Sequence, residues 1–196
     1  MIIIVDMNSG KIIRCFIALG IPVEIQAMLN DVVGQMQKSG ADVRWVDSSN
    51  IHLTLKFLGE LHPAVVREAG LALKSMEAEF KAIDSGLGRL GAFPSLDRPK
   101  VIWIGLAKGG EELKAIQRQV ENLTADISEE ERGRTFNPHL TLGRVRSDKR
   151  LGVLRESLRS VTVPRADFRL SKLMLVQSTL AREGAIYHPL WSVALG

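Results

Sequence analysis

The sequence predicts an α+β fold built mainly from antiparallel strands, and three observations indicate it. The apolar pattern of the 196 residues switches several times between a period of two and one of about 3.6, which is typical of mixed strands and helices. The predicted elements do not follow a regular βαβ order, and several neighbouring strands have links short enough for antiparallel pairing. No linker rich in Pro, Gly or Ser interrupts the chain, so we expect one domain over residues 1–196.

The first strand and the first helix are indicated by composition and by one proline. Residues 11–19 (KIIRCFIAL) are rich in β-branched side chains, which favour a strand. Pro22 stands at a helix-opening position, and apolar residues at helical spacing continue from there to Met36. We therefore expect a strand followed at once by a helix.

The middle of the chain is predicted to hold four strands and two helices. Polar residues at 47–50 separate the first two strands, and Pro63 opens the helix that follows them. The expected elements are strands at 43–46 and 51–58, a helix at 63–80, strands at 86–93 and 101–106, and a helix at 111–127.

The last third of the chain is predicted to be mostly strand. The expected elements are a strand at 139–145, a helix at 148–158, and strands near 168, at 173–178 and at 187–193.

A four-residue sequence, HLTL, occurs twice, and each copy begins at a histidine. The copies start at His52 and His139, 87 residues apart, in a chain with only four histidines. Because side chains alternate faces along a strand, each histidine shares a face with the threonine two positions later, Thr54 or Thr141. The leucines of each motif then point into a core. If an approximate two-fold relates the two halves, the polar faces can meet across a cleft.

Two imidazoles and two hydroxyls together suit the hydrolysis of a phosphodiester. Histidine has an unperturbed pKa of about 6.5, so one ring can activate water while the other protonates the departing alkoxide. The threonine hydroxyls can donate to phosphoryl oxygens, and Arg144 offers a planar donor fork. Arg144 lies an odd number of positions after Thr141, which puts it on the opposite face unless a bulge at Gly143 restores it.

The net charge of +4 is unevenly distributed. Residues 130–172 hold eleven Arg and Lys against five Asp and Glu, a local charge of +6 that leaves −2 for the rest of the chain. This excess surrounds the second histidine motif and favours contacts with a polyanion. Taken alone it fits a solvated helix face better, since Arg150, Arg155 and Arg159 have helical spacing. The charge supports a phosphate substrate without deciding it.

Other kinds of site find little support. Tetrahedral zinc needs three or four protein ligands, and neither histidine has a second ligand at suitable spacing, so we expect no metal. No Gly-rich phosphate loop is present, so we expect no nucleotide cofactor. Cys15 lies in an apolar strand and is expected to be a buried hydrophobe. We find no secretory signal or membrane-spanning run, and expect a cytoplasmic protein with no membrane partner.

The two motifs resemble those of the 2H phosphoesterase superfamily, whose hallmark is a pair of His-x-Thr/Ser-x tetrapeptides. Within it, the chain is similar to the RNA 2′,3′-cyclic phosphodiesterases formerly described as 2′-5′ RNA ligases. The segments that carry the resemblance are 14–19 (RCFIAL), 43–46 (VRWV), 50–60 (NIHLTLKFLGE), 136–144 (FNPHLTLGR), 177–180 (QSTL) and 187–190 (YHPL). Residues 1–10 precede the usual start and are expected to be an extension, and Gly143 replaces a common alanine.

The resemblance implies two interleaved, pseudo-symmetric lobes around a central V-shaped cleft, each an antiparallel sheet with outer helices. It also implies hydrolysis of a 2′,3′-cyclic phosphate end of RNA to a 2′-phosphate, without metal or cofactor. His52 would be the proton donor and His139 the proton acceptor, although the two labels could be exchanged. Thr54, Thr141 and Arg144 would hold the phosphate.

The partner implied is RNA with 2′,3′-cyclic phosphate ends, tRNA fragments included, bound by a monomer that also has weak reversible 2′-5′ ligation activity. Two alternatives stay open: the same chemistry on a small cyclic nucleotide such as ADP-ribose cyclic phosphate, and a non-catalytic module that binds RNA ends. Histidine at both motif positions speaks against pure binding, because a phosphate binder would gain more from Arg or Lys.

Two aromatic residues near the first motif, Trp45 and Phe57, could line the cleft or stack a nucleobase. For Phe57, the odd spacing from His52 favours the core instead.

Overall fold

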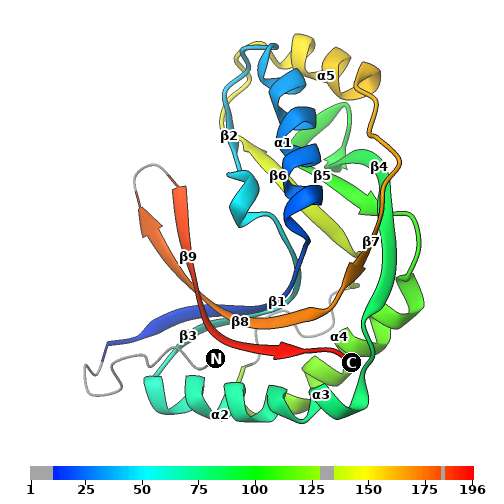
Figure 1. Cartoon of the computed structure of the whole chain (residues 1–196). Coiled ribbons are helices and arrows are strands. Elements are labelled where there is room, and N and C mark those ends of the chain that lie inside the picture. Colours follow the sequence, from blue (N-terminus) through cyan, green and yellow to red (C-terminus); the bar gives the residue numbers. More distant parts are fainter. Residues whose placement is uncertain (1–10, 129–134, 182–183) are drawn as a thin grey trace.

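The computed structural model describes residues 11–128, 135–181 and 184–196 (Figure 1). The extension predicted for residues 1–10 lies outside these described residues. The elements, in chain order, are β1 (Ile13–Gly20), α1 (Val23–Gln37), β2 (Val43–Trp45), the 3-10 helix η1 (Ser48–Asn50), β3 (His52–Leu61), α2 (Pro63–Lys74), α3 (Met76–Glu79), β4 (Ile83–Ser95), β5 (Arg98–Leu106), α4 (Gly110–Leu123), β6 (His139–Val145), α5 (Leu151–Ser160), β7 (Asp167–Leu170), β8 (Lys172–Ala181) and β9 (Gly184–Ala194).

The predicted helices differ from the observed ones mainly where they end. The helix expected at 63–80 is divided at Ser75, whose hydroxyl donates to the Ala72 carbonyl over 2.8 Å and so competes with the helical hydrogen bonds. The helix expected to reach residue 127 stops at Leu123, where the backbone of Thr124 leaves the helical conformation with φ −115° and ψ 13°. The Thr124 hydroxyl donates to the Val120 carbonyl at this helix end.

The strands form an antiparallel sheet that confirms the predicted α+β class. Every strand pair in the described part of the chain is antiparallel. The strand order is β7-β4-β5-β6-β3-β1-β8-β9, and β2 adds to β6. Strands β3, β1, β8 and β9 make a first half of this sheet, and β6, β5, β4, β7 and β2 make a second half.

The two halves meet at β3 and β6. Across this junction the described residues of the two strands form a single residue pair, Leu53 with Leu140. From there the halves diverge, which produces the predicted V-shaped arrangement of two lobes (Figure 1). The junction lies next to both histidines, since each leucine directly follows one of them.

Helices pack outside the strands. In the first half, α2 and α3 contact β9 while α4 contacts β3. The helix α1 follows β1 of the first half but packs with α5, which follows β6 of the second half. The halves are therefore interleaved along the chain. None of the helices in the described ranges is both long and apolar enough to cross a membrane.

The two faces of the sheet differ in what they bury. The four motif leucines all lie in the main core at 4% exposure or less, as predicted from strand alternation; they are Leu53, Leu55, Leu140 and Leu142. A separate, smaller apolar cluster lies on the other face of the first half, which we call the inner face. It consists of Phe16, Ala18 and Val176 with the partly buried Phe57, Met174 and Tyr187.

Candidate active site

His52 and His139 make the same local hydrogen bond. In each case the ring Nδ1 lies 2.7 Å from a backbone carbonyl two residues earlier, that of Asn50 or Asn137. A carbonyl can only accept, so Nδ1 donates, and the Nε2 of a neutral ring is left as an acceptor. Each strand therefore begins with an imidazole whose orientation and tautomer are set by its own backbone.

The register at the junction brings the two motifs together. Because β3 and β6 are antiparallel and pair at Leu53 and Leu140, the next positions place His52 towards Thr141 and Thr54 towards His139. In that register, each histidine would lie opposite the threonine of the other motif.

His52 lies among aromatic side chains of the first half. Its ring stacks on Phe16 with centroids 4.7 Å apart and meets Tyr187 edge-on at 5.2 Å. Burial among these rings lowers the pKa of His52 below its ordinary value of 6.5; the hydrogen bond to Asn50 opposes this shift, and the charge of His139 adds to it. The neutral form of His52 is therefore favoured.

His139 has a different pair of aromatic neighbours. Phe93 of β4 meets its ring edge-on at 5.2 Å, and Trp103 of β5 lies at 6.1 Å. We did not predict either residue from the sequence. Their closeness depends on the pairing of β5 with β6, which joins segments far apart in the chain, and no local pattern sets them apart from other strand aromatics.

A β-bulge in β6 carries Arg144 to the histidine face. Trp103 pairs with Thr141 but the preceding Ile102 pairs with Gly143, so Leu142 is an extra residue. Leu142 and Gly143 are both buried, and Arg144 is exposed. A bulge, which the sequence allowed at Gly143, is thus present, with Leu142 as its extra residue. It offsets the odd spacing and returns Arg144 to the face of Thr141.

The charge of Arg144 acts on a residue of the other half of the sheet. Burial raises the pKa of Tyr187, while the charges of Arg144 and, to a smaller extent, Arg14 oppose that rise. Tyr187 belongs to β9 of the first half and contacts His52. The Arg144 guanidinium therefore lies within electrostatic range of the surroundings of His52.

An equivalent bulge in β3 overturns the core placement predicted for Phe57. Thr54 pairs with Ala18 but Lys56 pairs with Ile17, so Leu55 is the extra residue. Phe57 consequently returns to the inner face, where its ring centroid lies 5.8 Å from that of Phe16. Strand alternation gave the wrong face because it assumed an unbroken ladder.

Two consecutive segments of the chain, residues 19–103 and 104–187, each match the description of the LigT-like phosphoesterases. The chain belongs to the LigT-like phosphoesterase family. The double match agrees with the internal repeat of the HLTL motif, since one motif falls in each segment.

Relatives and solved structures of this phosphoesterase family cover nearly the whole chain. A relative from Aeropyrum pernix, named RNA 2′,3′-cyclic phosphodiesterase, is 36% identical over 156 residues, which are 79% of this chain and 88% of the relative. One of the same name from Aquifex aeolicus is 30% identical over 183 residues, 90% of this chain and 94% of the relative. The crystal structure of E. coli LigT in apo form superposes with a TM-score of 0.74 at 25% identity, covering 94% of this chain and 98% of that one.

In this LigT-like phosphoesterase, Gly143 replaces an alanine that is common in similar sequences, and the replacement has a steric reason. A Cβ at Gly143 would lie 2.8 Å from the Trp45 ring and 2.9 Å from Val43. Trp45 pairs with Gly143 and packs against the main core, so its side chain lies on the core side of β2 and not in the cleft that the sequence suggested. Glycine here allows the indole to cover the bulge.

Lys56 occupies the place in the β3 bulge that Gly143 has in β6. Its side chain is fully buried, pairs with Glu121 of α4 at 2.8 Å and donates to the Ser128 carbonyl. This ion pair fastens α4 to the outer side of β3, away from the histidines.

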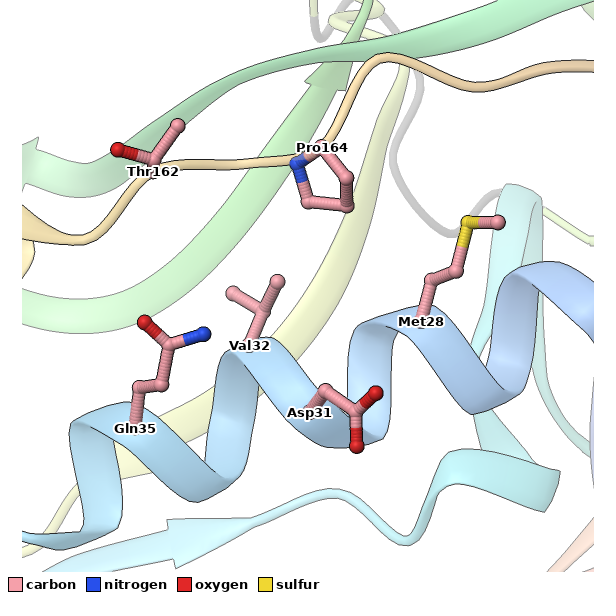
Figure 2. Close-up of a pocket in the computed structure, with 6 residues that line it drawn as sticks. All are labelled: Met28, Asp31, Val32, Gln35, Thr162 and Pro164. Carbon is pink, nitrogen blue, oxygen red and sulfur yellow. The ribbon is translucent and has the colours of Figure 1, made fainter.

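Other features of the phosphoesterase lie apart from the histidines. A pocket of about 360 Å³ lies between α1 and the segment before β7, and it is lined by Met28, Asp31, Val32, Gln35, Thr162 and Pro164 (Figure 2). Burial raises the pKa of Cys15 to about 12, as expected for an inert core thiol. Among the residues that the structure describes, no three His, Cys, Asp or Glu side chains are grouped so that they could hold a metal ion.

Proposed function

We propose that this protein hydrolyses the 2′,3′-cyclic phosphate end of RNA to a 2′-phosphate by acid–base catalysis between His52 and His139. The observation that carries this proposal is the placement of two identically hydrogen-bonded imidazoles, each directly before a leucine of the Leu53–Leu140 pair that joins β3 and β6. The relatives named RNA 2′,3′-cyclic phosphodiesterase support the choice of substrate.

In the proposed reaction, the Nε2 of neutral His139 takes a proton from water while the water oxygen attacks phosphorus. The bond between phosphorus and O3′ breaks, and protonated His52 gives its Nε2 proton to O3′. The products are a 2′-phosphomonoester and a free 3′-hydroxyl. Proton transfer back between the rings, directly or through water, restores the starting state, so the step needs no other reagent.

His52 must be protonated to act as this donor, whereas its surroundings favour the neutral form in the free protein. The bound phosphate resolves the conflict, because an anion beside an imidazole stabilises the imidazolium and raises its pKa. His52 is thereby charged chiefly when substrate is present. Thr54, Thr141 and Arg144 hold the phosphoryl oxygens, which gain charge in the transition state.

The finer parts of the proposal follow from the same site. The groups named supply acid, base and phosphate ligands, so we propose that no metal or cofactor takes part. The substrates include tRNA fragments, and the enzyme is a cytoplasmic monomer. Weak 2′-5′ ligation is the same displacement with the 5′-hydroxyl of a second RNA in place of water: His139 takes the hydroxyl proton, the bond between phosphorus and O3′ breaks, and His52 protonates O3′. Cleavage of the resulting 2′-5′ bond is the reverse reaction, in which the two histidines exchange roles.

The deciding experiment measures turnover of a short RNA with a 2′,3′-cyclic phosphate end in EDTA. We compare the parent with His52→Ala and His139→Ala, and with His188→Ala as a matched control at an exposed histidine. We expect a 2′-phosphate product, a loss of about 100-fold or more in each motif variant, and an unchanged control. No turnover by folded parent protein, or parent-like turnover in either motif variant, would sink the proposal.

A further inference from the structure

Two arginines face each other on the strand pair beside the histidines. Arg44 of β2 pairs with Arg144 of β6, and both side chains are exposed. Directly opposite residues of an antiparallel pair share a face, with Cβ atoms about 5 Å apart, and like charges in this arrangement destabilise the pair. The strand pair therefore carries a local cost that a bound anion would remove.

The next row of facing residues on the same strand pair shows how an arginine charge is usually compensated, by an acidic partner. Arg146 lies two positions beyond Arg144, and its Nε is 3.6 Å from Oδ1 of Asp42. The Oδ2 of the same carboxylate accepts from the Ser147 hydroxyl. Asp42 lies two positions before Arg44, so this row shares the face of the two arginines. In the described ranges of the chain, neither Arg44 nor Arg144 has an ion-pair partner of this kind.

The unpaired row is also the one nearer the histidines. Arg144 follows Thr141 on β6, separated from it by the bulge. Its charge opposes the rise that burial causes in the pKa of Tyr187, which lies beside His52. Arg44 stands on the adjacent strand, about 4.8 Å away across the ladder, on the same edge of β6 as β3. Two guanidinium forks at this spacing suit two anionic groups in a row, one at the reacting position and one beyond it.

We propose that Arg44, beside Arg144, binds the phosphodiester on the 5′ side of the terminal nucleotide, which makes an oligonucleotide the preferred substrate over a mononucleoside cyclic phosphate. This inference rests on the proposed function and names its substrate class. Arg144 serves the reacting phosphate in both kinds of substrate, whereas Arg44 serves only a substrate that has a second phosphate.

The test compares kcat/KM for a trinucleotide and a mononucleoside that share the same 2′,3′-cyclic phosphate terminus. The proteins are the parent, Arg44→Ala and the matched control Arg146→Ala, which removes a compensated charge from the same face. For Arg44→Ala we expect a loss of about tenfold on the trinucleotide, mostly in KM, and a change below about twofold on the mononucleoside. The log–log salt dependence for the trinucleotide should become shallower by about one unit.

Each outcome separates the two proposals. Equal losses on both substrates, no loss on either, or the same loss in Arg146→Ala overturns the role of Arg44 and leaves the proposed hydrolysis intact. No turnover of either substrate by the parent overturns both. Removing one of two facing like charges should not lower the thermal midpoint of Arg44→Ala, so a melting curve shows that the variant is folded.

Discussion

At the scale of single residues, the two histidines are alike in their hydrogen bonds and unlike in their surroundings. Both donate Nδ1 to a carbonyl two residues earlier. His52 stacks on Phe16 beneath Tyr187, whereas His139 meets the edge of Phe93. The pKa of His52 is lowered mainly by burial, because transfer of the imidazolium out of water is unfavourable. The first histidine of the repeat is therefore held mainly in its neutral form in the free protein.

The lowered pKa of His52 predicts how stability changes with pH. The folded protein holds this proton more weakly than the unfolded chain, so the unfolded chain takes up more protons once the pH falls below about 6.5. The contribution of His52 to the free energy of unfolding is complete above that pH and declines below it. His52→Gln should therefore lose less stability than the parent between about pH 7.5 and pH 5.5 in urea titrations.

An NMR titration of the ring protons measures the shift directly. His52 should titrate below 6.5 in the free protein and at a higher pH with inorganic phosphate present. His188→Gln is the control for the stability comparison, since that side chain is exposed. The same pH dependence in the parent and His52→Gln would contradict the expected effect of burial.

At the scale of elements, the two bulges decide which side chains reach the inner face. The HLTL repeat located both histidines and threonines, because those residues precede the bulges and follow simple alternation. Beyond them alternation fails. The glycine at 143 signalled one bulge and so allowed for the placement of Arg144. Lys56 gives no such signal, and Phe57 was therefore placed on the wrong face.

The bulge in β6 predicts a specific sensitivity at Gly143. Gly143→Ala puts a methyl group 2.8 Å from the Trp45 ring, which is tighter than packed side chains tolerate. We expect a loss of about 1–3 kcal/mol in the free energy of unfolding, measured in urea, with a fall in turnover as Arg144 moves.

Gly34→Ala is the matched control for this substitution. Gly34 lies in α1 with nothing within 4 Å of its added Cβ, so alanine there should stabilise the protein by about 0.5–1 kcal/mol. A parent-like stability of Gly143→Ala would show that Trp45 moves aside without cost.

At the scale of the whole molecule, a single main core spans both halves of the sheet. Local patterns were sufficient to place most strands and helices. They could not reveal which distant strands become neighbours, and for that reason the contacts of Phe93 and Trp103 with His139 and the facing of Arg44 with Arg144 appear only in the folded chain. Such pairings depend on register between segments up to about a hundred residues apart.

The continuous core predicts that the two halves unfold together. Trp191 reports on the first half, where it lies against Gly70 of α2, and Trp103 reports on the second. Variants that keep only Trp191 or only Trp103 of the three tryptophans should give fluorescence transitions in urea with the same midpoint as far-ultraviolet circular dichroism. Two separated midpoints would show that the halves have independent stability.

The bulges occupy matching places in β3 and β6, and the residue after each is Phe57 in one half and Arg144 in the other. A cyclic phosphate bridges two ester oxygens, O2′ and O3′, that differ little in leaving ability. An acid–base pair with true two-fold symmetry would present the same groups to both and release either one. In the proposed reaction, an apolar ring on one side and a guanidinium on the other make the two directions of approach unequal, and the regiochemistry of ring opening then depends on this broken symmetry.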